Sequence, residues 1–539
     1  MSSSHLSGHV LSPLFSIAAR LSLLAGCLAA LPLAATASGA AAPGWLPAKI
    51  LSTSSGDAVV PEVAADSRGD VAVVWTQAQG NRWTIQAAIR RAGRPWSKAR
   101  AISAVADHVG SPHIVFDGRG NALSVWERFD GKNFIAESAA YDAATDTWSP
   151  PVALSRPGRD AVTPRIAVNA RGEAVALWPS LTRSGWTMQA ASRTARGVWG
   201  PPVDLENPLQ GTGFPDVVVD PAGNAIAVWA QTSGAGFTVE SSYRPVGGAW
   251  GEVTDLSQPG RSDSITPQVA LEGDGGVDVV WARSTPTRTI VEEVVRSAAG
   301  AWSQPRRLSP PGPDAVAPAI VTNGRGAAAV VWTSSGKGGL AVVARYRRPG
   351  HDWGPAVTLS RSSSGPLSPQ VALDGQGDVV VVWTRSNGGR SRVQAMARQA
   401  ASGDWSAPKE LSGPGSDALT PQLALDGQGD GALAWSRCDQ KSCVVEAAGY
   451  DGSAPALDDL AVPARGAAGV PLTFSVAPLD VWSAVTSIRW SFGDGTAATG
   501  RRETHVYARP GRYAVRVTVS DSKGHVSTAT RVVTIAARS

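Results

Sequence analysis

The sequence is short of charge, of cysteine and of histidine. Charged residues make up 17% of its 539 positions, and it contains only three cysteines and seven histidines. The formal net charge is +5 and no basic run occurs, so the sequence carries no electrostatic sign of nucleic-acid binding. Its 58 glycines and 38 prolines favour short strands joined by tight turns over a helical fold.

Long apolar runs are absent beyond the N-terminus, so no transmembrane segment is predicted. Near the start, Arg20 precedes an apolar stretch over residues 21–33, and an Ala-Thr-Ala sequence follows at residues 35–37. This pattern predicts a signal peptide over residues 1–37 and a secreted protein. The same stretch contains a Leu-Ala-Gly-Cys sequence ending at Cys27. A lipid anchor on Cys27 at the cell surface is therefore the alternative.

The other two cysteines, Cys438 and Cys443, are separated by four residues. Because secretion is expected, we predict that they form a disulfide across a hairpin. No second pair of metal ligands lies near them in the sequence, which disfavours a zinc site. The sequence predicts no metal and no cofactor.

Tryptophan, in contrast, is abundant, with 20 copies, and most of them recur at a fixed spacing. Two series of eight run through the chain with a period of 51 or 52 residues, which is typical of a solenoid or a propeller. The first series is Trp75, Trp126, Trp178, Trp229, Trp281, Trp332, Trp383 and Trp435. The second is Trp45, Trp96, Trp148, Trp199, Trp250, Trp302, Trp353 and Trp405.

Each repeat has the same internal order. A proline stands 14 residues before each first-series tryptophan, at Pro61, Pro112, Pro164, Pro215, Pro267, Pro318, Pro369 and Pro421. Between them, two apolar runs flank a turn, and they predict strands A and B of a hairpin. An alternating stretch predicts strand C. A second-series tryptophan, with Leu or Ile six residues later, predicts strand D. Four strands per repeat predict a propeller blade.

The repeats begin and end out of phase, and this offset predicts a closed ring. The mature chain starts with a lone strand D at residues 45–51, and the repeats finish with strands A to C near residue 450. An N-terminal strand that completes the last blade removes two exposed edges. We therefore expect an all-β protein with an eight-bladed β-propeller over residues 45–450; a β-solenoid is the alternative. The units resemble the Trp-rich repeats of uncharacterised secreted bacterial proteins, a resemblance that implies a fold and little chemistry.

A different pattern follows the repeats. Residues 451–466 are rich in Ala, Pro, Gly and Asp and predict a linker. Beyond them stand Trp490-Ser-Phe-Gly-Asp-Gly, His505-Val-Tyr and Pro510-Gly-Arg-Tyr, in the order of the PKD domain signature. The chain over residues 455–537 thus resembles a PKD domain. That resemblance implies an immunoglobulin-like β-sandwich that serves as an adhesive or spacing module in extracellular proteins.

Two sets of residues are candidates for ligand binding on the rim formed by the D-to-A and B-to-C loops. The first set is an aspartate four positions before the strand-A proline, at Asp57, Asp160, Asp263, Asp314 and Asp417. These residues could form an acidic ring, or each could cap a turn. The second set is an aromatic residue eight positions after the first-series tryptophan, at Trp83, Phe134, Trp186 and Phe237. These side chains could stack on a sugar, or pack between blades.

Catalytic motifs such as H-E-x-x-H and G-x-S-x-G are absent from the sequence. At the start of strand A, Glu62, His113 and Asp216 could serve a hydrolase if they share one quadrant of the channel. A repeat fold places scattered polar residues there in any case. The A-to-B turns, such as residues 66–70, faintly resemble calcium loops but lack the terminal glutamate of an EF-hand. We therefore expect no catalytic residue and no enzyme.

Together these features predict a monomeric extracellular binding or adhesion protein. Its propeller rim would contact a glycan or a protein, and its PKD domain would act as a spacer or adhesive module. The alternative is an extracellular glycoside hydrolase or lyase that uses carboxylates of the propeller channel. A structural surface protein without a discrete ligand is a third possibility.

Overall fold

The computed structural model describes residues 44–53, 56–206, 208–232, 236–260, 262–336, 338–362, 367–386 and 389–538. The expected signal peptide over residues 1–37, and Cys27 within it, lie outside these residues. The regular structure of the described residues is β-strand throughout. Among them there is no helix with the length and apolar character needed to span a bilayer.

Each of the eight repeats folds into one antiparallel sheet, and we number these sheets blade 1 to blade 8 in the order of their first strands. The first strands are β3 (Ala58–Ala65), β7 (Val109–Phe116), β12 with β13 (Asp160–Ala161 and Arg165–Val168), β17 (Gly211–Val219), β21 (Ser264–Leu271), β25 (Asp314–Thr322), β29 (Gln370–Leu373) and β33 (Asp417–Leu425). The second strands are β4 (Val71–Gln79), β8 (Ala122–Phe129), β14 (Ala174–Thr182), β18 (Ala225–Thr232), β22 (Val277–Ser284), β26 (Ala328–Gly336), β30 (Val379–Arg385) and β34 (Gly431–Cys438).

The third and fourth strands complete each blade. The third strands are β5 (Arg82–Arg90), β9 (Phe134–Asp142), β15 (Gly185–Arg193), β19 (Phe237–Arg244), β23 (Thr289–Arg296), β27 (Gly339–Arg347), β31 (Arg392–Arg398) and β35 (Cys443–Asp451). The fourth strands of blades 1 to 7 are β6 (Arg100–Ala101), β10 with β11 (Thr147–Trp148 and Val152–Ala153), β16 (Val203–Asp204), β20 (Thr254–Asp255), β24 (Arg306–Arg307), β28 (Val357–Ser362) and β32 (Lys409–Glu410).

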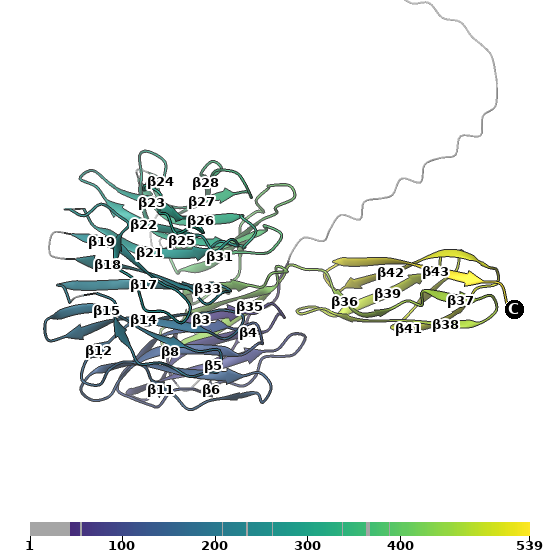
Figure 1. Cartoon of the computed structure of the whole chain (residues 1–539), viewed down its shortest axis with the longest axis horizontal. Coiled ribbons are helices and arrows are strands. Elements are labelled where there is room, and N and C mark those ends of the chain that lie inside the picture. The colour runs from purple at the N-terminus through teal and green to yellow at the C-terminus, as the bar shows by residue number, and fades with distance from the viewer. Residues whose placement is uncertain are drawn as a thin grey trace, which may run out of the picture. The chain divides into compact units, whose positions relative to one another are not determined.

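The last blade takes its fourth strand from the N-terminal end of the described chain. Strands β1 (Gly44–Trp45) and β2 (Lys49–Ile50) both pair antiparallel with β35. First strands of neighbouring blades contact one another, and β3 contacts both β7 and β33. In Figure 1, β6 and β24 lie at opposite edges of the repeat region, and β3, β17 and β33 lie between them. The first strands therefore line the middle of this region.

The first-series tryptophans form the core of the blades. All eight are at most 1% exposed, and each lies on a second strand that is buried over most of its length. Apolar side chains on both faces of these strands pack against the neighbouring blades, as the continuous apolar runs predict. Burial of this kind stabilises the fold by about 25 cal/mol per Å² of apolar surface.

The fourth strands are shorter than the sequence predicts. In blade 2 the expected strand from Trp148 to Leu154 is broken into β10 and β11, and Pro150 and Pro151 lie between the two parts. Proline has no backbone N–H, so it cannot donate to the ladder at these positions. Prolines keep the outer edge of the blade irregular, which protects it against pairing with another chain.

The first strands carry a bulge that the sequence analysis does not anticipate. In every blade, the residue before the proline that stands 14 residues ahead of the first-series tryptophan has a left-handed φ. These residues are Val60, Ser111, Thr163, Phe214, Thr266, Ala317, Ser368 and Thr420. In blade 1 the register with β4 shifts between Val59 and Glu62 at this point. A left-handed conformation is unusual for β-branched residues and for residues before proline. A bulge turns the side chain that follows it, which here is the residue directly after the proline.

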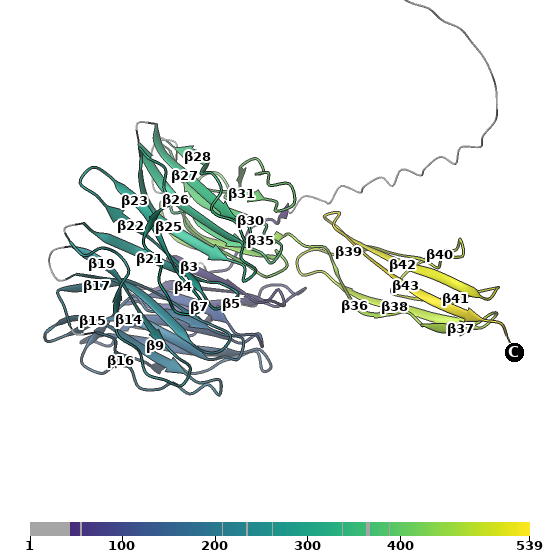
Figure 2. The ribbon, with the colours of Figure 1, turned by 45° about the horizontal axis from the view of Figure 1, so that its top comes forward.

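The C-terminal region is a β-sandwich of two sheets. One contains β36 (Ala456–Ala461), β38 (Pro471–Leu479) and β41 (Arg502–Val506). The other contains β37 (Arg465–Ala467), β43 (Val526–Ala536), β42 (Gly511–Asp521), β39 (Val485–Ser491) and β40 (Ala497–Thr499). In Figure 2, β39 and β42 lie in one layer and β36 and β38 in the other. Residues 451–466, expected as a linker, include β36 and the start of β37, because Leu457 and Leu460 of β36 pack against the sandwich core.

Candidate functional site

Four ionisable side chains gather on the first strands of blades 1 to 4. Glu62, His113, Arg165 and Asp216 each follow the proline of their strand directly, and each is partly buried. We call them the first-strand cluster. A bulge stands in front of each proline and turns the side chain that follows, and each of these four side chains contacts a residue of another blade. The sequence pattern marked Glu62, His113 and Asp216 as channel residues, but it assigned no role to Arg165.

Arg165 is the cation of this cluster. Its Nη1 lies 3.5 Å from Oε1 of Glu62, a residue two blades away. The Arg165 side chain is 41% exposed, whereas the Glu62 side chain is 14% exposed. Glu62 also accepts a hydrogen bond of 3.3 Å from Nε2 of Gln422, across the junction of blades 8 and 1. The guanidinium is therefore the more accessible partner, available to an anionic ligand.

His113 and Asp216 each reach the first strand of the next blade. The backbone N–H of Ile166 donates to Nδ1 of His113 at 3.3 Å. The backbone N–H of Val269 donates to Oδ2 of Asp216 at 2.9 Å. Because Nδ1 of His113 accepts this bond, the neutral imidazole carries its proton on Nε2. These bonds fix the orientation of both side chains between neighbouring blades.

Burial and Arg165 shift the proton affinities of the cluster. Burial raises the pKa of Asp216 to about 6 and also raises the pKa of Glu62, although Arg165 opposes both shifts. Burial, together with repulsion from Arg165, lowers the pKa of His113 to about 3. At neutral pH the cluster thus offers an uncharged imidazole at His113, a carboxylate at Asp216 whose pKa of about 6 lies close to neutral, and a cation at Arg165. Such displaced pKa values are typical of acid–base sites.

The structure gives the predicted rim aspartates a common set of contacts. Each accepts a hydrogen bond from a backbone N–H at the start of the third strand of the preceding blade. The pairs are Cys443 to Asp57, Phe134 to Asp160, Phe237 to Asp263, Thr289 to Asp314 and Ser391 to Asp417, at 2.7 to 3.1 Å. These bonds join neighbouring blades. A role of the same carboxylates in ligand binding stays a prediction.

The predicted rim aromatics are half-buried. Phe134 lies 5.1 Å from His108 and 5.3 Å from Phe129 between ring centroids, and its backbone meets Asp160. Trp83 packs against the buried cluster between blades 1 and 2. The structure therefore brings two of these aromatics, Phe134 and Phe237, together with predicted aspartates. It does not bring any of the four into the first-strand cluster.

The A-to-B turns use their aspartates as internal acceptors. Oδ1 of Asp66 accepts hydrogen bonds of 2.9 Å from the N–H groups of both Arg68 and Asp70. Oδ1 of Asp374 accepts the equivalent pair from Gln376 and Asp378 at 2.8 Å. This arrangement is that of a tight turn closed by its first side chain.

In blade 8, Cys438 and Cys443 form the predicted disulfide across the β34–β35 hairpin.

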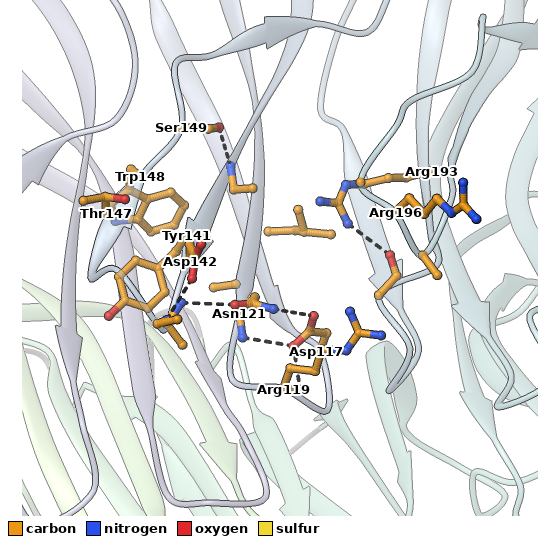
Figure 3. A pocket seen from close by; sticks show the side chains of 18 of the residues that line it. Asp117, Arg119, Asn121, Tyr141, Asp142, Thr147, Trp148, Ser149, Arg193 and Arg196 are labelled. Atoms are coloured by element: carbon orange, nitrogen blue, oxygen red, sulfur yellow. Dashed lines mark hydrogen bonds between the residues drawn. The ribbon is translucent and has the colours of Figure 1, made fainter.

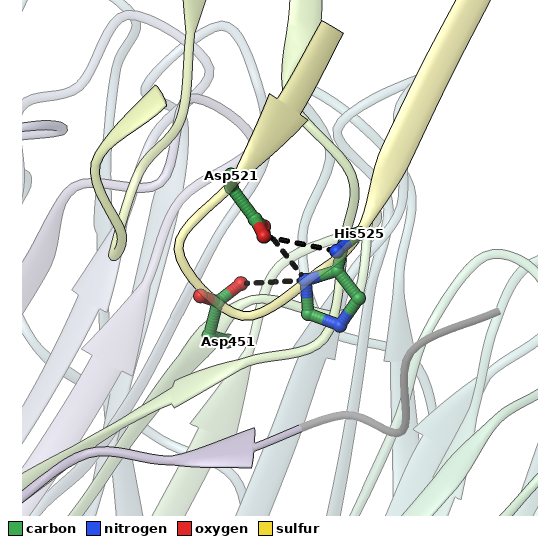
Figure 4. Close-up of side chains that lie close together, drawn as sticks. All are labelled: Asp451, Asp521 and His525. Atoms are coloured by element: carbon green, nitrogen blue, oxygen red, sulfur yellow. Dashed lines mark hydrogen bonds and ion pairs between the residues drawn. The ribbon is translucent and has the colours of Figure 1, made fainter. Parts of the chain in front are cut away.

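Another buried group of charged side chains lies at the end of β35 and was not found from the sequence. Nδ1 of His525 is 2.8 Å from Asp521 and 3.5 Å from Asp451, as Figure 4 shows. Burial raises the pKa of Asp451 to about 7. Hydrogen bonds from His525 and Lys523 outweigh burial and lower the pKa of Asp521. These three residues lie close enough to share one cation. Asp451 stands some 70 positions before Asp521 and His525 in the sequence, which hides the cluster from motif analysis.

Solved structures with a similar course of the chain include carbohydrate-cleaving enzymes. An ulvan lyase is 11% identical with a TM-score of 0.43, over 65% of this chain and 97% of that chain. Another polysaccharide lyase is 8% identical with a TM-score of 0.42, over 67% and 92%. A sialidase of Streptococcus pneumoniae is 10% identical with a TM-score of 0.35, over 70% and 83%. The expectation that this protein is not an enzyme is corrected by this finding, since it rested only on missing motifs.

The curated relatives that match are bacterial collagenases, and they match over a short stretch. A microbial collagenase of Vibrio alginolyticus is 39% identical over 74 residues, which is 14% of this chain and 9% of the relative. A collagenase of Bacillus cereus is 47% identical over 51 residues, 10% of this chain and 5% of the relative. The chain thus spans less than a tenth of the length of either. The PKD domain model matches residues 452–535, which coincide with the β-sandwich. Residues 452–535 are a PKD domain.

Proposed function

We propose that this protein is an extracellular glycan-cleaving enzyme and that the first-strand cluster is its active site. The observation that carries the proposal is the position of Arg165, a partly exposed cation beside Glu62 and close enough to His113 and Asp216 to shift their pKa values. A cation surrounded by acid and base groups suits a substrate that bears its own carboxylate. We therefore infer a polysaccharide that contains uronic acid, cleaved by a lyase reaction.

Each member of the cluster has a role in such an elimination. Arg165 would bind the uronate carboxylate and lower the pKa of the carbon-bound proton next to it. The Asp216 carboxylate would take that proton from C5, and the electron pair would form a C4=C5 double bond while the C4–O bond breaks. Glu62, whose pKa burial raises, would give its proton to the leaving oxygen. The Nε2–H of His113 would hold the substrate by a hydrogen bond.

The rest of the chain is proposed to support this reaction. The contact of β33 with β3 and the pairing of β1 with β35 support a closed eight-bladed propeller over residues 45–450, with the cluster in its channel. The N-terminal pattern and the PKD domain support secretion. The PKD domain would act as a spacer or adhesive module beside the propeller. Binding of glycan without cleavage is the second candidate, supported by the half-buried aromatics of the rim.

The test is an activity assay of the purified chain on a panel of polyuronates and neutral glycans. A lyase product absorbs in the ultraviolet because of its new double bond, whereas hydrolysis releases reducing ends without that absorbance. We expect absorbance on polyuronates only. Replacing Arg165, Asp216 or Glu62 by Ala, Asn or Gln, respectively, is expected to lower kcat/KM by about 10² to 10⁴.

A matched control exists in blade 7. Gln370 stands at the same first-strand position as Arg165, so Gln370→Ala tests general damage to these strands. We expect it to retain activity. Reducing ends without absorbance would contradict the lyase chemistry. Glycan binding without any cleavage would favour the second candidate, and neither binding nor cleavage on the panel would overturn the proposal.

A further inference from the structure

The third strands of the blades end in a repeated arginine. At the position opposite the first residue of the second strand, six blades carry Arg90, Arg193, Arg244, Arg296, Arg347 and Arg398, and the other two carry Tyr141 and Tyr450. We call these six residues the seam arginines. A seam is the contact between the ends of the third strands of two neighbouring blades, and it is named by those two blades.

Five of the six seam arginines have an aromatic ring over the guanidinium. Arg296 and Arg398 face Tyr243 and Tyr346 of the preceding blade, at 4.5 and 4.0 Å from the ring centroids. Arg244 and Arg347 face second-series tryptophans of their own blade, Trp250 at 6.0 Å and Trp353 at 5.0 Å. Arg90 faces Trp482 at 3.6 Å. Cation–π contacts of this kind are therefore a regular part of the seams.

Trp482 differs from the other four rings because it does not come from a blade. It lies in the turn between β38 and β39 of the PKD domain. Arg90 also donates from Nη2 to the carbonyl oxygen of Val481 at 2.5 Å, and the N–H of Gly93 donates to the same oxygen at 3.2 Å. The 8/1 seam thus takes up a turn from outside the repeats.

Blade 8 accommodates this turn because it lacks a side chain at one position. Gly449 stands where blades 4 and 6 carry Tyr243 and Tyr346, by register with the second strands. A Cβ on Gly449 would lie 2.3 Å from two carbons of the Trp482 ring. The 8/1 seam is therefore one that lacks its own aromatic ring and receives one from another part of the chain.

Arg193, in the 2/3 seam, is the remaining seam arginine. Among the residues described by the structure, no aromatic ring lies over its guanidinium. Nη1 donates to the carbonyl oxygen of Gly172 at 3.0 Å, and burial lowers the pKa of Arg193. A pocket of about 760 Å³ opens beside it, lined by Ala140, Tyr141 and Trp148 among others. Figure 3 shows Arg193 and Trp148 on opposite sides of this pocket.

The 2/3 seam resembles the 8/1 seam at several positions. Ala140 corresponds to Gly449, so again no aromatic side chain comes from the preceding blade, but the Cβ of Ala140 keeps a ring farther from the strand than Trp482 lies from Gly449. The remaining wall is also shared, since Tyr141 lies 5.6 Å from Trp148 and Tyr450 lies 4.7 Å from Trp45 between ring centroids. The 2/3 seam therefore has the same kinds of wall residue as the 8/1 seam, which holds the turn with Trp482.

We propose that the 2/3 seam binds an aromatic side chain at the tip of a turn in a partner polypeptide. The ring lies on the Arg193 guanidinium, and the carbonyl of the residue before it accepts a hydrogen bond from Arg193, as Val481 does from Arg90. Arg196 and Arg119 line the same pocket and are exposed. Arg196 also stands where the 8/1 seam has Gly93, and it adds a positive charge to the 2/3 seam. The partner turn therefore carries an acidic residue beside its aromatic one.

The favoured occupant is a different protein and not a second copy of this chain. The turn of this chain that fits such a seam, residues 480–483, is already held by Arg90 in the 8/1 seam. Because this turn is covalently linked to the propeller, it binds its own 8/1 seam at a high effective concentration. It is therefore not free to enter the 2/3 seam of another molecule. The proposal goes beyond the glycan-cleaving function and does not depend on it.

The test uses the full chain and a cyclic peptide with the sequence of residues 478–485, Pro-Leu-Asp-Val-Trp-Ser-Ala-Val. We expect saturable binding by calorimetry, and none with a peptide in which Ala replaces Trp. Arg193→Gln is expected to weaken binding about tenfold or more, from the loss of a cation–π contact and a charge-assisted hydrogen bond. Arg193→Lys, which keeps the charge but loses the planar face, should also weaken it. Ala140→Gly should strengthen it severalfold.

Arg244→Gln is the matched control, because Arg244 already has Trp250 over it, and it should bind like the wild type. Unchanged thermal unfolding of the Arg193 variants confirms that they fold. Absence of peptide binding by the wild type, or equal binding by Arg193→Gln, overturns the proposal. A concentration-dependent dimer in sedimentation, lost in both Arg193→Gln and Trp482→Ala, would make the occupant a second copy and overturn the assignment to a different protein.

Discussion

The guanidinium of Arg90, in blade 1, lies 3.6 Å from the ring centroid of Trp482, in the PKD domain. The two residues are almost 400 positions apart in the sequence. Trp482 also touches the backbone at Gly449, where any side chain would collide with its ring. One tryptophan thus connects the first blade, the last blade and the C-terminal domain.

This contact predicts an energetic coupling between Arg90 and Trp482. In a double-mutant cycle of Arg90→Ala and Trp482→Ala, we expect a coupling energy of about 0.5–2 kcal/mol, because each single variant already removes the cation–π contact. Denaturant unfolding of the four proteins measures it. A parallel cycle of Arg244→Ala with Trp482→Ala is the control and should be additive. Additivity of the Arg90 cycle would contradict the coupling.

The fold was largely predictable because its determinants are periodic. The tryptophan at the centre of each second strand is buried in all eight blades, so one position per repeat reports the core. The lone fourth strand expected at residues 45–51 likewise predicted the pairing of β1 with β35. The broken fourth strands were not predicted, since the six-residue spacing from Trp148 to Leu154 does not reveal how two prolines interrupt the ladder between them.

The candidate site was predictable only in part. The sequence pattern placed Glu62, His113 and Asp216 on equivalent strand positions, but not the bulge that turns them, because a left-handed residue before proline has no compositional sign. Arg165 occupies the same position in blade 3 and was therefore within reach of the same reasoning. The ring of Trp482 over Arg90 depends on tertiary contacts that no local pattern contains.

The bulge predicts an unusual response to glycine. Val60 has a φ of 53° and is 43% exposed, so its side chain contributes little burial while its backbone is strained. We expect Val60→Gly to leave stability unchanged or to raise it by up to about 1 kcal/mol, since glycine adopts this conformation freely. Val63→Gly in the same strand is the control and should destabilise the protein by about 1–3 kcal/mol through lost packing. Equal losses in thermal unfolding would show that the bulge is unstrained.

Asp216 predicts the pH dependence of the proposed activity. Its pKa of about 6 means that the carboxylate, the form that acts as a base, is populated above this pH and lost below it. We therefore expect kcat/KM on a polyuronate to rise with pH through about 6 and to fall again at the higher pH at which Glu62, the proposed acid, loses its proton. The native state also holds a proton that the unfolded chain releases near pH 4, so Asp216 destabilises the fold as pH rises from about 4 to 6. Asp216→Asn should remove both effects, measured by a pH–rate profile and by unfolding at several pH values. A profile that falls through pH 6 would exclude Asp216 as the base.

The rim aspartates allow structure and ligand binding to be separated. Asp314 accepts a hydrogen bond of 2.7 Å from the N–H of Thr289 in the preceding blade. Removing this acceptor leaves a backbone donor without its partner, so Asp314→Ala should destabilise the protein by about 1–2 kcal/mol. Asp107→Ala is the control: its side chain is 78% exposed and faces Arg82 at 3.5 Å, and an exposed ion pair of this kind contributes little.

The decisive comparison is between stability and glycan affinity in the same Asp314 variant. If the carboxylate only joins blade 6 to blade 5, thermal unfolding shifts while affinity for a bound glycan stays the same. If it also contacts ligand, affinity falls by more than the unfolding shift explains. Asp314→Asn sharpens the distinction, because its amide oxygen still accepts from Thr289 while the charge is gone. We expect Asp314→Asn to restore most of the stability lost in Asp314→Ala and to bind glycan like the wild type, since the structure already engages this oxygen between blades.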